Sequence, residues 1–421
     1  MTLCPNKHDN PPTFTICQTC GLPVFDIAHE VEALTNTIRS KSTLTRPKMS
    51  SDLVGVGPFG VGILAKVKSS NNAQKGSRLA FISVDNIDAE NKVLEDGTSF
   101  LVALGQDTMG STFCGRAENI AKINPTLLSV LRRTGFRDPD ENQSILLAHA
   151  LGDGTGSGVS HVVLERGRML NSRCFNYVLA LQPSISDSIH SQINAFYGLS
   201  CLLQSNGDAT LADAIILIQY DRLKQLRGVG STGEELKMEE LFAVLFRLMA
   251  STLTGPGISK IGTLLRWNRT PLLIPCLAVG RSLEIFGSLS NILESCIAYP
   301  LCQISREKIS SSYLLLNVPR RVEKKFPESE INDELTAFSH KYFPNIGSIS
   351  YQLCYSDEQH DRIDACLLLG GDTSTISTTI VAYEKFKQGA KTASDWEIYG
   401  LTRERIAEAE RTLDIYDKKA T

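Results

Sequence analysis

The chain has 421 residues, of which 42% are hydrophobic and 21% are charged, a balance typical of a globular protein of two to three domains. Its formal net charge of −3 gives no overall positive field, so nucleic acid is not indicated as a partner. The sequence has no apolar run long enough to span a membrane and no signal-like N-terminus, so we expect a cytoplasmic protein.

The first twenty residues hold a cluster of side chains that bind metals. Cys4 and His8 are followed by the pair Cys17 and Cys20, a spacing that lets two short knuckles hold one tetrahedral zinc ion. A segment this short has no hydrophobic core, and binding of the ion would therefore supply the free energy that folds it. We predict a zinc ribbon over residues 1–25 that docks an unknown protein partner, with a nucleic-acid contact and an inert cap as the alternatives for its role. A redox pair or a disordered reduced tail are the alternatives.

Eight further cysteines are scattered singly through apolar segments of the chain. This placement is typical of small buried hydrophobic residues and not of disulfides. They are Cys114, Cys174, Cys201, Cys276, Cys296, Cys302, Cys354 and Cys366.

Strand and helix patterns alternate through a predicted domain that covers residues 51–255, after a polar tether at 26–50. The expected strands lie at 53–56, 79–84, 144–150, 177–181 and 214–218, and the expected helices at 118–131 and 238–253. This order predicts an α/β fold with a doubly wound parallel sheet, whose ligand loops lie at the carboxyl ends of the strands. The helix at 238–253 is expected to be the long central helix.

Residues 256–421 are predicted to form a second, α+β domain that ends in a helix. The expected strands lie at 271–279, 313–318, 349–354 and 364–369, and the expected helices at 283–297, 330–343 and 402–416. The last helix is amphipathic with interspersed Arg and Glu, which predicts that one face packs while the other is solvated.

Two glycine-rich segments follow predicted strands, at the places where a ligand loop is expected. The first contains Gly55, Gly57, Pro58, Phe59 and Gly60. The second consists of Gly152, Asp153, Gly154, Thr155, Gly156, Ser157 and Gly158. Glycine lets main-chain N–H groups approach a phosphate, the two hydroxyls add donors, and a helix N-terminus favours an anion. The second segment therefore predicts a phosphate cradle, and a flexible linker is the alternative.

The sequence GDGTGSG at 152–158 resembles the GGGTGSG signature of the tubulin/FtsZ superfamily of GTP-binding filament proteins. The segment 55–62 is similar to the first nucleotide loop of FtsZ, and the resemblance extends over residues 51–400. It implies bound GTP or GDP, a central helix, a second domain of the tubulin/FtsZ type and head-to-tail assembly of identical subunits into filaments.

The same resemblance implies roles on the phosphate side of the site. Gly115 and Arg116 occupy the place of the loop that senses the γ-phosphate in the family. Asp85 or Asp88 would hold magnesium, directly or through water, and an exposed turn is the alternative.

On the base side, the resemblance implies that Asp187 contacts the ribose and that Asn194 reads guanine. The segment 218–223 resembles the FtsZ stretch I-P-N-D-R-L, with Tyr220 in place of the Asn. It sets Asp221 where a carboxylate can accept from guanine N1–H and the 2-amino group. Helix-face and N-cap roles for Asn194 and Asp221 are the alternative.

The chain departs from the family in the loop that supplies catalytic carboxylates to the next subunit. Lys260, Gly262 and Leu265 stand where the family has Asn and two acids. Without a carboxylate to position the attacking water, we expect weak or absent hydrolysis. Asp153 also adds a negative charge beside the phosphates, which predicts an altered affinity or metal dependence.

Two other functions fit parts of this pattern. A nucleotide-sensing regulator that never polymerises and docks partners through the zinc ribbon is the main alternative. A Rossmann-type dehydrogenase is disfavoured, because no acidic residue follows the first glycine segment at the distance that a ribose contact needs.

Overall fold

A computed structural model describes residues 2–3, 9–10, 50–69, 78–83, 99–103, 112–124, 127, 143–171, 174–206, 209–230, 232–253, 271–325, 327–346, 349–356, 360–387 and 394–418. The chain divides into two compact units, Met1–Lys48 and Met49–Thr421. In the first unit, β1 (Thr2–Leu3) pairs antiparallel with β2 (Asp9–Asn10), so that Leu3 lies opposite Asp9.

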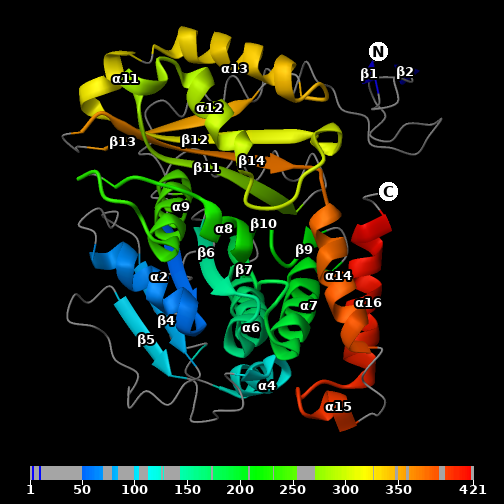
Figure 1. The fold of residues 1–421 in the computed structure, drawn as a ribbon. Helices are drawn as coiled ribbons and strands as arrows, with labels where there is room; N and C mark the ends of the chain where they lie inside the picture. Colours follow the sequence, from blue (N-terminus) through cyan, green and yellow to red (C-terminus); the bar gives the residue numbers. More distant parts are fainter. Residues whose placement is uncertain are drawn as a thin grey trace. The chain divides into compact units, whose positions relative to one another are not determined.

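A ten-stranded sheet runs through the second unit in the order β13-β12-β14-β11-β10-β7-β6-β3-β4-β5 (Figure 1). Its strands are β3 (Ser50–Val56), β4 (Arg78–Ser83), β5 (Ser99–Ala103), β6 (Gln143–Ala150), β7 (Phe175–Gln182), β10 (Ala214–Gln219), β11 (Leu272–Ser282), β12 (Ser311–Pro319), β13 (Ser350–Ser356) and β14 (Arg362–Gly370). From β5 to β11 neighbouring strands are parallel, while β14 is antiparallel to both β11 and β12. Strands β8 (Ser205–Asn206) and β9 (Ala209–Thr210) form a separate small hairpin.

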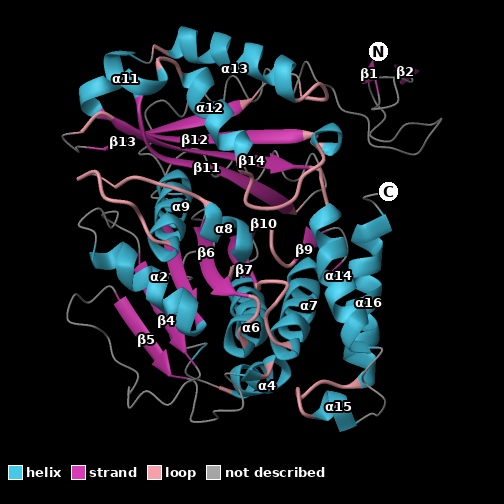
Figure 2. Cartoon of the chain, in the orientation of Figure 1, coloured by secondary structure: helices cyan, strands magenta, loops and turns pink. Residues whose placement is uncertain are grey.

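The central strands of the parallel part of the sheet are buried on both faces, because apolar residues follow one another along them and point alternately to the two faces. In β10, Ile215 and Leu217 belong to one apolar cluster while Ile216 and Ile218 belong to another. This is the pattern of a sheet with helices on both sides, which Figure 2 shows directly. The predicted mixed α/β fold with a mostly parallel sheet, compatible with a doubly wound domain, is confirmed.

Helices cover both faces of this sheet. One face is covered by α2 (Gly57–Ser69), α8 (Tyr220–Gln225) and α9 (Met238–Leu253), and the other by α4 (Cys114–Ile123), α6 (Gly154–Leu170), α7 (Ile189–Leu203), α14 (Ser374–Lys387) and α16 (Arg403–Lys418). Short helix α15 (Ser394–Glu397) precedes α16. The amphipathic pattern of the last helix is confirmed, since Ile406, Ala409 and Leu413 are buried.

The C-terminal strands carry a third apolar cluster on the face away from α9. It is covered by α11 (Leu283–Phe286), α12 (Leu289–Ala298) and α13 (Glu328–Tyr342), with single 3₁₀ turns at Arg306–Lys308 and Arg320–Lys325. The single helix expected at 283–297 is wrong: Gly287, with φ +75°, ends α11 before α12 starts. The helix expected at 118–131 instead begins at Cys114 and ends at Ile123.

Helix α9 matches the predicted central helix from its first residue to its last. Its side chains Phe242 and Leu245 belong to an apolar cluster that includes Leu146 of β6 and Tyr313 of β12. The predicted domain boundary at 255–256 falls in residues 254–270, outside the described residues, and stays a prediction. One core nevertheless reaches strands on both sides of it.

The scattered cysteines are free thiols in the fold. Seven of the eight are buried and Cys354 is partly buried.

The described helices include none with the length and apolar character that a membrane span requires.

Candidate functional site

The two glycine segments meet at the carboxyl edge of the sheet. Strands β3 and β6 are parallel neighbours, and the strand order reverses between them, which opens the crevice where ligands bind to folds of this kind. Gly57 has φ +73°, and a Cβ there would collide with the Asp153 carboxylate and lie 3.2 Å from the amide nitrogen of Gly156. A Cβ at Gly60 would collide with the carbonyl of Ala148. Glycine is therefore required where the two turns touch.

Asp153 caps the helix that starts at the second turn. Its carboxylate accepts hydrogen bonds from the amides of Thr155, at 3.3 Å, and Gly156, at 3.2 Å. An N-terminal carboxylate also interacts favourably with the helix dipole. The main-chain donors that the sequence assigned to a phosphate are thus bonded to a resident anion.

The hydroxyls of the second turn face the protein interior, and their role as phosphate donors stays a prediction. Ser157 donates to the carbonyl of Leu151 at 2.6 Å, and the Thr155 side chain is fully buried. Beneath this turn lies His149 of β6, whose pKa burial lowers to about 3. The imidazole is therefore neutral at physiological pH.

Asn194 of α7 ties the start of α4 to the glycine turn. Its amide nitrogen donates to the carbonyls of Thr112, at 2.8 Å, and Gly152, at 3.1 Å, while its oxygen accepts from the amide of Cys114 at 3.1 Å. The side chain is buried. The main chain thus uses the donors and the acceptor that a base edge would need, and the reading of guanine by Asn194 stays a prediction.

Two carboxylates meet around Ser184, at the ends of the next two strands. Asp187 accepts from the Ser184 amide at 2.9 Å, and Asp221 accepts from the Ser184 hydroxyl at 3.0 Å. Tyr220, half-buried at the start of α8, packs against the core beside them. A Cβ at Gly152 would lie 3.1 Å from the Cβ of Pro183, so this loop adjoins the glycine turn. Polar groups therefore continue along the edge from β3 to β10.

Gly115 and Arg116 lie against the C-terminal segment. The Arg116 amide donates to the carbonyl of Tyr399 at 3.1 Å, and its Nε donates to the carbonyl of Ile398 at 2.9 Å. A Cβ at Gly115 would lie 2.6 Å from the carbonyl oxygen of Gly400. The predicted phosphate sensor is thus engaged by residues far along the chain.

Several predicted site residues lie outside the described residues. These are the zinc ligands Cys4, His8, Cys17 and Cys20, the magnesium candidates Asp85 and Asp88, and the loop positions Lys260, Gly262 and Leu265. Within the described part of the chain, no group of three or more His, Cys, Asp or Glu side chains is arranged to hold a metal ion.

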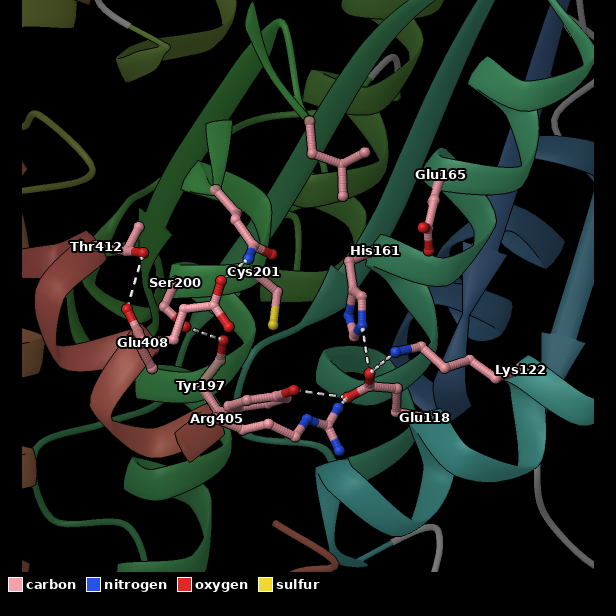
Figure 3. A pocket seen from close by; sticks show the side chains of 13 residues that line it. Glu118, Lys122, His161, Glu165, Tyr197, Ser200, Cys201, Arg405, Glu408 and Thr412 are labelled. Carbon is pink, nitrogen blue, oxygen red and sulfur yellow. Dashed lines mark hydrogen bonds and ion pairs between the residues drawn. The ribbon is translucent and has the colours of Figure 1, made fainter. Parts of the chain in front are cut away.

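A polar cavity of about 370 Å³ lies among α4, α6, α7 and α16 (Figure 3). At its floor lies Glu118, whose side chain is only 2% exposed. Its carboxylate is paired with Arg405 and, at 2.5 Å, with Lys122. His161 lies 3.3 Å from the same carboxylate, and burial lowers its pKa to about 4. The sequence did not indicate this cluster, because Arg405 lies more than 240 positions along the chain from Glu118, Lys122 and His161.

No protein-family model matches this sequence, and no curated protein matches it either. Only the fold shows that residues 57 and 153 touch and that the two glycine turns meet, because these residues lie far apart in the sequence.

Proposed function

We propose that this chain is a GTP-binding protein of the tubulin/FtsZ type, which holds the polyphosphate where the two glycine turns meet. The observation that carries the proposal is the contact of Gly57 with Asp153 and Gly156, at the reversal of strand order. Helices α2 and α6 both start there, and their N-termini favour an anion.

The base is directed along the edge toward Ser184. Asp221 supplies a carboxylate acceptor there, which suits guanine because its N1–H and 2-amino group are two adjacent donors, while Asp187 would contact the ribose. Asn194 contributes indirectly, by holding the start of α4 to Gly152.

The proposal includes slow hydrolysis and assembly into filaments. Lys260, Gly262 and Leu265 supply no carboxylate to activate water, so the bound nucleotide stays a triphosphate. Ile185 and Ile189, beside the proposed base site, are 70% and 50% exposed, and a second copy stacked head to tail would cover them. Sedimentation with GTP and electron microscopy test the assembly, and a protein that stays monomeric contradicts it.

A zinc ribbon at the N-terminus and magnesium at Asp85 or Asp88 belong to the same proposal. The pairing of Leu3 with Asp9 supports the ribbon, because it flanks the segment from Cys4 to His8 with a hairpin. Elemental analysis should give one zinc per chain, and an unchanged content in a Cys17→Ser, Cys20→Ser variant would exclude this site.

The decisive experiment is mass identification of the nucleotide that copurifies with the chain. We expect GTP in the parent and its loss in Gly57→Ala, because a side chain there is strained at positive φ and collides with Asp153. Gly62→Ala is the matched control and should keep the nucleotide, since no atom lies within 4 Å of a Cβ at this position. An adenine nucleotide, or none in any of the three proteins, contradicts the proposal.

A further inference from the structure

The C-terminal segment 394–418 covers the start of α4. Beyond the two bonds from Arg116, the hydroxyl of Tyr399 lies 2.6 Å from Nδ1 of His190, at the start of α7. The Tyr399 ring also packs edge-on against Phe113, with ring centroids 5.1 Å apart. Figure 1 shows α15 and the turn into α16 beside α4. Distant parts of the chain thus meet at one end of the proposed site.

Glu118 fastens α16 to the helices that begin at this edge. Its carboxylate is paired with Arg405 of α16 and accepts from the hydroxyl of Tyr197 of α7 at 2.7 Å. The Arg405 guanidinium also lies over the Tyr197 ring, 5.2 Å from its centroid. Figure 3 shows these side chains converging from three helices on the floor of the cavity. A carboxylate so deeply buried is stable only while its partners stay in place.

The start of α4 belongs to the same edge as the glycine turns. A Cβ at Gly158 would collide with the carbonyl of Cys114, and Asn194 bonds both Cys114 and Gly152. Arg116, two residues beyond Cys114, has a main-chain N–H and a guanidinium at this same end of α4. Both are bonded to carbonyl groups of the C-terminal segment.

We propose that Glu118 is a positioning residue through which the C-terminal segment 394–418 competes with a bound nucleoside triphosphate for Arg116. This inference rests on the proposed function. When phosphate oxygens accept from the Arg116 N–H groups, residues 398–399 lose their hydrogen bonds to α4. The contact of α16 with Glu118 at Arg405 then weakens. Because coupling between two sites is reciprocal, weakening the hold of the C-terminal segment must tighten nucleotide binding.

Two variants weaken this hold. Tyr399→Phe removes the hydroxyl that meets His190 and keeps the ring, and Arg405→Met removes the partner of Glu118 and keeps an apolar stem. Arg403→Met is the matched control, since Arg403 is an exposed arginine of the same helix. The dissociation constant for GTPγS and the melting temperature are measured for each protein. We expect both variants to bind about fivefold or more tightly, while the control binds as the parent does.

A second measurement reports the movement of α16. Cys201 is a buried thiol that lines the cavity beneath this helix. Its rate of alkylation, followed on its own peptide by mass spectrometry, should rise about fivefold when GTPγS binds to the parent. A merely structural role for Glu118 predicts lower melting temperatures with unchanged or weaker binding and no response of Cys201, and that result overturns the inference.

The experiment separates this inference from the proposed function. If the parent and the control bind GTPγS with the same dissociation constant as Tyr399→Phe and Arg405→Met, only the competition is refuted. If none of the four proteins binds GTPγS, the proposed function is refuted and the inference with it.

Discussion

At the scale of single residues, burial decides which polar groups are free for a ligand. Asn194 has the donor and acceptor that a base edge needs, yet three main-chain groups use them. Ser157 likewise donates to Leu151. A polar side chain that follows a glycine turn can therefore hold the turn in place and leave ligand binding to the main chain.

His149 makes the free energy of unfolding depend on pH. Its pKa falls from the ordinary value of 6.5 to about 3 because the ring is buried. Above pH 6.5 the ring is neutral in both the folded and the unfolded chain, so the fold keeps its full stability. As the pH falls below 6.5, the unfolded chain binds a proton that the native ring does not, and the fold loses stability. Between pH 7 and pH 5 we expect a loss of about 2 kcal/mol from this residue.

Urea unfolding at the two pH values tests this prediction. The His149→Leu variant should lose about 2 kcal/mol less than the parent, whatever its stability at pH 7. His340→Gln is the control, because His340 is exposed, and it should lose as much as the parent. Equal losses in the parent and His149→Leu would show that burial of this ring carries no pH dependence.

At the scale of elements, helix α6 is capped at its N-terminus by the Asp153 carboxylate, which competes with the proposed ligand. Asp153 accepts hydrogen bonds from the amides of Thr155 and Gly156, whereas the glycine that stands at this place in the GGGTGSG signature it resembles carries no side chain. The carboxylate satisfies two of the donors that the first turn of any helix leaves open. It would also repel a phosphate, so the cap that stabilises α6 should weaken binding of the proposed nucleotide.

Replacing this cap should therefore strengthen nucleotide binding. In Asp153→Gly we expect the dissociation constant for GTP to fall about tenfold, equivalent to about 1.4 kcal/mol, while unfolding becomes easier by a few tenths of a kcal/mol. Asp153→Asn keeps a capping oxygen without the charge and should lie between the two. Calorimetric titration with and without magnesium measures the effect, and weaker binding by the glycine variant would refute it.

At the scale of the whole molecule, one sheet and one core join strands β3 to β10 to the C-terminal strands. Strands β10 and β11 pair in parallel at Ile215 and Ile216, and α9 packs against strands on both sides of this pairing. The C-terminal helices then return to the first half, where Tyr383 stacks on Phe196 with ring centroids 3.6 Å apart. Residues near the end of the chain thus complete the core around the proposed site.

This arrangement predicts a single unfolding transition for residues 49–421. The chain has two tryptophans, so Trp267→Phe leaves Trp396, which lies against Tyr383, as the only reporter of the C-terminal segment. Its fluorescence and the far-ultraviolet circular dichroism of the whole chain should change at the same urea concentration. Separate midpoints would show that the C-terminal segment unfolds on its own.

Local patterns in the sequence were sufficient for most of the fold. Apolar runs predicted β6, β7 and β10, and helical spacing predicted α9 from Met238 to Leu253, because side-chain periodicity depends only on neighbouring residues. The break at Gly287 was missed, since one glycine in an otherwise helical pattern is tolerated until tertiary packing selects its positive φ.

The sequence by itself determined most strands of the large sheet, the central helix and the two glycine turns, all of which depend on short-range spacing. Only the tertiary structure decided that Gly57 touches Asp153, that Asn194 bonds to Gly152, and that Glu118 pairs with Arg405. These contacts join residues far apart in the chain, and they form because helix and sheet packing brings their elements together, which no local pattern encodes.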